Sequence, residues 1–292
     1  MSRASWLLLL PALLACRPDL DMAVLERDYQ PDTEYVVEMV MNTRRSLHRG
    51  TGSDLAPVMD EQVQELRTSQ RVETGPMRDG AMDLVVEMLD YRVVEPGLRL
   101  RMNLDGCVGQ AEYRPADRSM RWLGLADTSW QAPATPTDSG WTQQALPRED
   151  AASYLATAVD LLAAALQDSV RSLAPGQGWV ETRPQETLVG PFPVAWLERR
   201  TVSLDSIRQE VAHLSVRVDL LPQDQPGGPP VELKGEGRGR LAFDLRHRCT
   251  RLNQLDSHLD IEILDGETSW VARSETSLDI RTTVKAKAPS KE

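Results

Sequence analysis

Two stretches of this chain alternate strictly between apolar and polar residues. In residues 211–220 every second side chain is apolar, and the same period returns at Leu259, Ile261 and Ile263. Successive side chains of a β-strand point to opposite faces of a sheet, so this period separates a dry face from a wet one. One solvated face is typical of antiparallel sheets. The pattern therefore predicts a mainly β chain whose dry face needs a cover.

One segment has helical spacing instead, over about residues 147–174. Leu155, Val159, Leu162 and Leu166 recur about one turn apart, and Pro175-Gly176 follows as a stop signal. We therefore expect a mainly β (α+β) fold. It is either a curved antiparallel sheet or a two-lobed β meander, packed around this one long central helix. The expected strands cover residues 35–41, 62–72, 81–94, 98–103, 109–113, 119–125, 196–201, 210–220, 231–243, 245–252 and 270–284.

The N-terminus carries an export signal. Residues 6–14 form an apolar run that is too short to span a bilayer but has the length of a signal-peptide core. The run ends in Leu13-Leu14-Ala15-Cys16, which resembles the lipobox of bacterial lipoproteins. The resemblance implies that Cys16 receives a diacylglycerol and becomes the new N-terminus after cleavage. The alternative is an ordinary secretory signal with an incidental cysteine.

Lipidation would make the protein a soluble domain on a lipid anchor, because two or three acyl chains hold stably in a membrane. Arg17 stands where inner-membrane lipoproteins often carry Asp, which favours the outer membrane, facing the periplasm or the cell surface. Loss of residues 1–15 removes Arg3 and takes the net charge from −11 to −12. This acidic balance argues against nucleic acid as a partner, since phosphates would be repelled.

The remaining chain divides by composition. We expect a tether over residues 16–33, a single β-rich domain over 34–285 and a disordered tail over 286–292. Within the domain, halves at 34–130 and 177–285 are joined by a loop and the helix, over residues 131–176. Residues 99–104 before Cys107 are similar to residues 240–245 before Cys249, which indicates either a distant repeat or two amphipathic strands alike by chance.

Cys107 and Cys249 are the two cysteines of the exported body. In an oxidising compartment thiols within reach tend to pair, and this bridge would close a loop long enough to add about 4–5 kcal/mol. Two separate buried thiols acting as small apolar side chains are the alternative. The sequence leaves the two open, because it does not show whether the Cα atoms come within bridging distance.

No catalytic or metal motif stands out. The chain lacks a Gly-x-Ser-x-Gly elbow and a His-Glu-x-x-His helix, so we expect no enzyme, no cofactor and no catalytic residue, although a hydrolase with scattered groups would leave no motif. The acidic strand with His258 is best explained as a solvated face rather than a metal site. His247 and Cys249 lack a third ligand for zinc. Three glycines alternate along one expected strand and leave one of its faces without side chains: Gly235, Gly237 and Gly239. Such a face allows a bend, a strong twist or close approach of the helix, and the alternative is a ligand that rests on the backbone.

The strand meander, the single helix and the lipid anchor together are similar to the LolA/LolB-like envelope lipoprotein carriers, in which a sheet wraps a helix around an apolar cavity. The resemblance implies a membrane-tethered binding or carrier module. Its ligand, an acyl chain or another apolar molecule, would lie between the sheet and Leu155, Val159, Leu162 and Leu166. The alternative is a structural or adaptor lipoprotein that docks an envelope protein complex through its surface. Six tryptophans of the body are candidates for core packing or for a pocket lining: Trp122, Trp130, Trp141, Trp179, Trp196 and Trp270.

Overall fold

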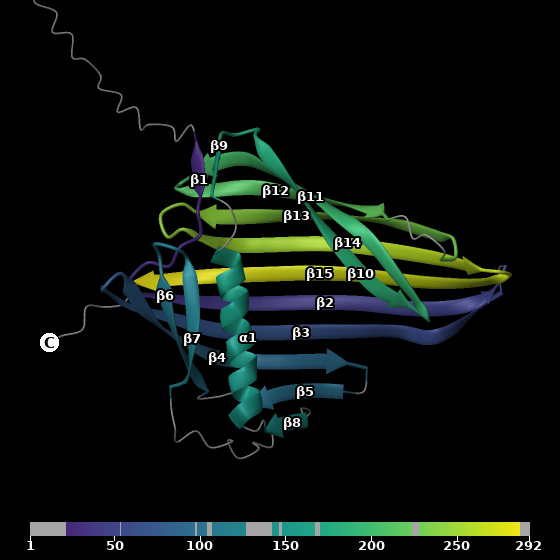
Figure 1. Ribbon diagram of the computed structural model, residues 1–292, viewed down its shortest axis with the longest axis horizontal. Coiled ribbons are helices and arrows are strands. Elements are labelled where there is room, and N and C mark those ends of the chain that lie inside the picture. The colour runs from purple at the N-terminus through teal and green to yellow at the C-terminus, as the bar shows by residue number, and fades with distance from the viewer. Residues whose placement is uncertain are drawn as a thin grey trace, which may run out of the picture.

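The computed structural model describes residues 22–52, 54–96, 98–103, 107–126, 142–145, 148–166, 170–223 and 228–286 (Figure 1). The expected signal peptide and Cys16 lie outside these residues. The prediction of a mainly β fold built on an antiparallel sheet is confirmed. The elements are β1 (Ala23–Leu25), β2 (Thr33–Thr51), β3 (Asp54–Arg78), β4 (Ala81–Glu95), β5 (Leu98–Asn103), β6 (Val108–Arg114), β7 (Ser119–Leu125), β8 (Thr142–Ala145), α1 (Arg148–Leu166), β9 (Arg171–Leu173), β10 (Gly178–Val189), β11 (Phe192–Arg208), β12 (Val211–Pro222), β13 (Val231–Asp244), β14 (Cys249–Asp265) and β15 (Thr268–Ala286).

One large sheet joins both halves of the chain. Its order is β10-β11-β12-β13-β14-β15-β2-β3-β4-β5-β8, and the β6–β7 hairpin branches from β4. The halves meet where β15, the last strand, pairs antiparallel with β2 along the full length of β2. The two similar segments, around residues 99–104 and 240–245, lie in strands with different kinds of partner. The first lies in β5, which pairs antiparallel with β4 and parallel with β8, and the second lies in β13, which pairs antiparallel with β12 and β14. Hence the two halves form one sheet rather than two lobes.

The sheet has an inner face and an outer face, which the strand register defines. Tyr35, Leu214 and Ile261 share the inner face and are almost completely buried. Charged side chains cover the outer face, as in the ion pair between Arg44 and Glu275 (3.8 Å). Strict alternation thus produced one dry and one wet face, as the sequence predicts.

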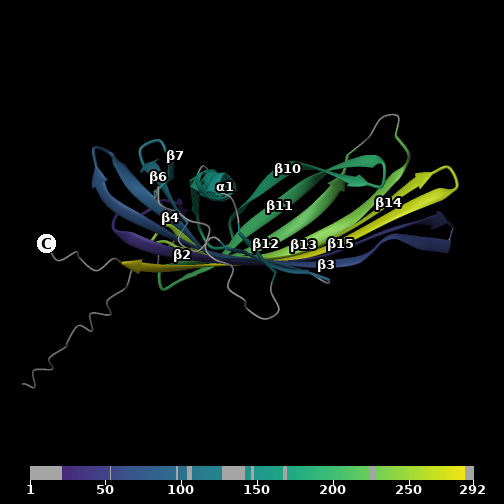
Figure 2. The same cartoon turned by 90° about the horizontal axis from the view of Figure 1, so that it is seen from below.

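The expected helix is shorter than predicted and is not central. α1 ends at Leu166, and residues 171–173 form β9, which pairs with β1. Leu173 gains a buried apolar site beside Ala23 there, so a partner strand from the N-terminus outweighs helical propensity. α1 packs at one end of the sheet, against β4 and the β6–β7 hairpin, through Leu155 (0 % exposed). The sheet stays open and does not wrap around the helix (Figure 2), so that part of the prediction is wrong.

The segment expected as a tether is partly packed on the body. Residues 22–30, here called the N-terminal strap, run from β1 across the β13–β14 turn. The Asp28 backbone N–H donates to the Arg248 carbonyl (3.0 Å), and Arg27 donates to Thr250 Oγ1 (2.7 Å). The Tyr113 hydroxyl donates to the Asp28 carboxylate (2.7 Å). The expected tether is therefore packed on the body over residues 22–30, and its earlier part lies outside the described residues.

Three apolar clusters stabilise the inner face. The first lies under α1 and β6–β7, the second joins β11, β12 and β13 to β1 and β9, and the third lies under the tip of the β10–β11 hairpin. That tip rests on β15, where the Phe192 and Trp270 rings meet edge to face at 6.3 Å. Gly190 takes a positive φ of 59° there, and a Cβ on it would lie 2.6 Å from the Trp270 ring. A glycine is therefore required at the tip.

Candidate apolar binding site

Two rows of apolar side chains cross the inner face between α1 and the β10–β11 hairpin. The first, here the Met41 row, follows the register from β10 to β4 and consists of Trp179, Val202, Val216, Gly239, Leu255, Leu278, Met41, Leu66 and Val93. The second, here the Met39 row, lies one step nearer the strap and consists of Leu204, Leu214, Leu241, Asn253, Ile280, Met39, Thr68 and Tyr91.

The two rows are buried at one end and only half-buried in the middle. Val202 and Leu204 on β11 are 3 % and 0 % exposed and belong to the second cluster. On β15 and β2, however, Leu278 and Met41 are only half-buried. Apolar surface that the described part of the chain leaves partly open, on the face that carries the core, is the kind of surface that binds apolar ligands.

A cavity of about 240 Å³ continues from the Met39 row towards the strap. Asn253 and Ile280 of that row line it, together with Val37 and Thr282 beside them on the inner face. The strap forms its other wall. An engineered apolar cavity of roughly 150 Å³ already binds benzene, so this volume is sufficient for a segment of a hydrocarbon chain.

Tyrosines form the floor of this cavity. Tyr29 of the strap meets Tyr35 and Tyr113 edge to face, with ring centroids at 5.2 and 5.6 Å. Burial raises the pKa of Tyr29, and burial raises the pKa of Tyr35 to about 12. Both phenols are therefore neutral at physiological pH, and the floor is a packed aromatic surface rather than a source of acid or base.

A polar row, here the Thr43 row, borders the Met41 row on the side away from the strap. It runs through Glu181, Arg200, Val218, Gly237, Ser257, Thr276, Thr43 and Gln64. Thr43 is 4 % exposed. The next row adds Arg183, Glu198, Leu220, Gly235, Leu259, Ser274 and Arg45. Polar side chains therefore border the Met41 row on the β10–β11 hairpin and on β14, β15, β2 and β3, whereas Val218 and Leu220 on β12 are apolar.

The ionic groups of the hairpin balance one another. Arg200 donates to Glu198 (2.9 Å), and Arg183 donates to Glu181 (2.8 Å). Burial raises the pKa of Glu181, but hydrogen bonds from Trp179 and Arg183 outweigh it, so the net shift is downward. Two buried N–H groups on β11, Arg200 Nε and Trp196 Nε1, have no acceptor among the described residues.

The sequence-predicted pocket residues lie elsewhere. Leu155 and Val159 are 0 % and 1 % exposed in the first cluster, where they contact the protein's own core. The side chains of Leu162 and Leu166 lie outside the described residues, as do Trp130 and Trp141. Met39 and Met41 lie in the expected strand over residues 35–41, but they were not predicted as a binding surface. The signal was the run of apolar residues at every second position from Tyr35 to Met41.

Cys107 and Cys249 converge on one cluster. Cys107 is 1 % exposed in the first apolar cluster, and Cys249 packs against the same cluster from the cavity wall. Both are thiols in the structure rather than halves of a disulfide. Burial, with Asp244 nearby, raises the pKa of Cys249 to about 12, so its thiol is protonated and a poor nucleophile. The disulfide stays a prediction.

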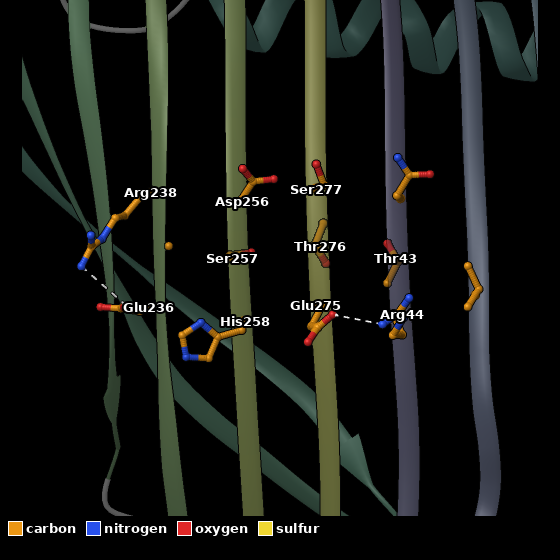
Figure 3. Close-up of a pocket in the computed structure, with 13 residues that line it drawn as sticks. Thr43, Arg44, Glu236, Arg238, Asp256, Ser257, His258, Glu275, Thr276 and Ser277 are labelled. Carbon is orange, nitrogen blue, oxygen red and sulfur yellow. Dashed lines mark ion pairs between the residues drawn. The ribbon is translucent and has the colours of Figure 1, made fainter.

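The polar candidates from the sequence lie on the outer face or at a turn. Within the described ranges no three His, Cys, Asp or Glu side chains gather as metal ligands would. His258 lines a shallow depression of about 670 Å³ on the outer face, where Arg44 pairs with Glu275 and Arg238 with Glu236 (Figure 3). These pairs are exposed and match the solvated-face interpretation.

His247 and the glycine strand have structural roles. His247 Nδ1 lies 2.8 Å from the Asp244 carboxylate, within the β13–β14 turn. A Cβ on Gly235 would lie 2.5 Å from Leu220 Cδ1, and one on Gly237 would lie 3.2 Å from Val218 Cβ. Side chains of β12 therefore lie against the bare strand face at Gly235 and Gly237.

Comparisons with known proteins do not assign this chain to a family. Neither the family models nor the curated proteins contain a match. A structure of lipovitellin, titled for its lipid–protein interactions, is similar over 91% of this chain and 26% of its own, with a TM-score of 0.40 and 10% identity. The outer membrane protein OprG from Pseudomonas aeruginosa is similar over 88% of this chain and 99% of its own, with a TM-score of 0.17 and 6% identity. These scores are too low to carry function over. Within the described residues no helix is long and apolar enough to cross a bilayer.

Proposed function

We propose that this chain is a lipid-anchored lipoprotein of the bacterial envelope that binds the acyl chain of a lipid on its inner sheet face. The observation that carries the proposal is the half-buried middle of the Met41 and Met39 rows, which opens into the 240 Å³ cavity. From β14 to β4 the Met41 row crosses four strand spacings, or roughly 19 Å at about 4.8 Å each. Each buried CH₂ contributes about 0.8 kcal/mol, so a chain along this row would bind through its length.

The proposed anchor and the proposed site are neighbours in the chain. The lipobox-like Leu13-Leu14-Ala15-Cys16 would hold the protein at the outer membrane, facing the periplasm. The strap begins six residues after Cys16 and forms one wall of the cavity. Six residues span at most about 20 Å, so the cavity would lie close to the membrane from which a lipid enters. No catalytic step belongs to this proposal.

The experiment uses the full chain with Cys16→Ser, which blocks lipidation, and two matched second substitutions. Leu278→Glu places a carboxylate in the Met41 row, whereas Ser277→Glu places the same group on the outer face. A carboxylate facing an acyl chain pays desolvation, so Leu278→Glu should weaken binding of a fluorescent fatty acid by at least about tenfold. Ser277→Glu should leave the affinity unchanged.

Native mass spectrometry of the Cys16→Ser protein purified from bacteria gives the second readout. We expect co-purified lipid that Leu278→Glu removes. Equal fatty-acid affinity in both variants, with lipid-free protein throughout, would contradict the proposal.

One observation favours an adaptor role as the second candidate. β10 is an edge strand that pairs only with β11 among the described strands, and it carries Val180 and Leu188 at 59 % and 72 % exposure. Such an edge is a template for strand addition, although Pro184 interrupts its row of N–H donors. In-cell crosslinking from a photoreactive residue at position 182 tests this role. A stable protein adduct would support it, and labelling by lipid or solvent alone would count against it.

A further inference from the structure

The polar row beside the apolar rows restricts the kind of ligand that fits. The Thr43 row and the Met41 row are two residues apart along each strand, or about 7 Å. A ligand whose chain lies along the Met41 row would therefore place its end, or its head, against the Thr43 row, which runs from Arg200 on β11 to Thr276 on β15 and beyond. Burying purely apolar surface against these groups would leave them without hydrogen-bond partners, which costs free energy.

Two buried N–H groups on β11 lack an acceptor in the part of the chain that the structure describes. Arg200 donates through Nη2 to Glu198, but its Nε is buried without a partner. Trp196 lies on the same strand and is 9 % exposed, and its indole Nε1–H is likewise buried without an acceptor among the described residues. Buried donors are nearly always paired in folded proteins. Trp196 belongs to the third apolar cluster, and Arg71 Nε, the other such group among the described residues, lies on the outer face. Arg200 stands in the row next to the half-buried Met41 row, so we assign its Nε–H to a ligand oxygen.

The charges around Arg200 restrict the head group that a ligand can carry. Glu181, Arg183, Glu198 and Arg200 sum to zero, so the wall does not attract an anion by net charge alone. It offers a donor at Arg200 and carboxylates beside it. A head with phosphate oxygens and a cationic group complements both.

We propose that the ligand is an amphiphile with a zwitterionic phosphate head, its chain on the Met41 and Met39 rows and a phosphate oxygen accepting from Arg200 Nε–H. This rests on the proposed function and specifies its ligand class. A hydrogen bond between charged groups is worth enough to favour such a head by about tenfold over one without an acceptor.

The test compares probes with one chain and different heads, each below its micelle concentration, on the Cys16→Ser protein. Dodecylphosphocholine carries the phosphate, and dodecyltrimethylammonium carries the same chain and cation without an acceptor. The protein's charge of −11 favours the cationic probe, so a preference for dodecylphosphocholine would come from the head contact. Inorganic phosphate alone is the third probe and should show no measurable binding, because the chain supplies most of the affinity.

The variants isolate the Nε donor. Arg200→Lys keeps the charge and removes Nε–H, so it should reduce the preference at least about fivefold while leaving dodecyltrimethylammonium binding unchanged. Thr276→Val removes a hydroxyl from the Thr43 row and should also reduce the preference for dodecylphosphocholine. Arg199→Lys is the control, because Arg199 pairs with Asp219 on the outer face. Thermal unfolding of each variant shows that it is folded.

The outcomes distinguish the ligand head group from acyl-chain binding itself. Tight binding of both dodecyl probes without a preference, or a preference unchanged by Arg200→Lys, would overturn this inference and leave acyl-chain binding intact. Absence of binding by both dodecyl probes would overturn the proposed function as well. Binding of inorganic phosphate as tight as that of dodecylphosphocholine would show an anion site instead of an amphiphile site.

Discussion

Replacing Asp244 by Asn should destabilise the turn that supports the cavity wall. Asp244 ends β13 and is 2 % exposed. Its Oδ1 accepts the backbone N–H groups of Arg246 and His247, both at 2.9 Å. Its Oδ2 accepts from His247 Nδ1 at 2.8 Å and pairs with Arg251 at 2.6 Å. The turn leads directly into Cys249 and Thr250, which line the cavity.

The loss of unfolding free energy depends on which contacts of the carboxylate an amide can keep. Asn retains a carbonyl oxygen for the two backbone N–H groups, but its NH₂ faces the donor Arg251 and can bond His247 Nδ1 only if that nitrogen becomes an acceptor. Hydrogen bonds to charged groups contribute about 1.5–3 kcal/mol each. Arg251 is 48 % exposed, so solvent screens its share. We therefore expect a loss of about 3 kcal/mol, or a fall in Tm of roughly 6–12 °C for a domain of this size.

The stability difference between wild type and Asp244→Asn should also depend on pH, in a direction set by the pKa of Asp244. Burial raises the pKa of Asp244, but the hydrogen bonds from His247 and the charge of Arg251 outweigh it and lower the pKa below its usual range. A carboxyl whose folded pKa is lowered stabilises the fold fully above the unfolded value of about 3.9 and loses this contribution as pH falls through the folded pKa. The difference between wild type and Asp244→Asn should therefore be constant above about pH 5 and shrink below pH 4.

Urea unfolding from pH 7 to pH 3, followed by circular dichroism, measures this difference. Asp256→Asn on the outer face of β14 is the matched control, because Asp256 is exposed, and should change stability by less than about 0.5 kcal/mol. A difference below about 1 kcal/mol for Asp244→Asn at pH 7, or one that persists unchanged at pH 3, would refute the reasoning.

Three further predictions concern the packing of α1, the anchor and the cysteines. Leu155→Ala should cost about 3 kcal/mol in urea unfolding, since Leu155 is 0 % exposed between α1 and the sheet; a loss below about 1 kcal/mol would mean that α1 is loosely attached. Cys16→Ala should move the protein from the membrane to the soluble fraction of lysed bacteria, and unchanged membrane fractionation would disprove lipidation. Protein isolated from the periplasm under thiol-blocking conditions should show a peptide joining Cys107 and Cys249, because both pack on one cluster; complete alkylation of both thiols would rule the bridge out.

The alternation in the sequence predicted strands and faces but not their partners. The period of two in residues 211–220 and 259–263 fixes which side chains share a face, and the structure confirms it. It contains no information on register, so the pairing of β15 with β2, which joins the ends of the chain, was not predictable. Residues 171–173 show the same limit, since they continue a helical pattern but gain more by pairing with β1.

The candidate site was predictable only in its chemistry. An apolar ligand surface was expected on the strength of a one-sided sheet, but it was placed on Leu155 and its neighbours, which are packed core. Met41 and Leu278 look like core residues in the sequence, because apolar alternation is the same whether or not a face is covered. The half-buried state of these two side chains depends on where α1 and the hairpin lie, which is a property of the assembled fold.

The proposed function requires that an acyl chain lies on the inner face. A palmitate analogue with a diazirine at mid-chain, irradiated with the Cys16→Ser protein and mapped by peptide mass spectrometry, locates the chain directly. We predict adducts on the stretches that contain Met39, Met41, Leu278 and Ile280, and their loss under competition by unlabelled palmitate. Adducts spread over the outer face, around His258 and Glu275, or labelling that palmitate does not compete, would contradict the central claim.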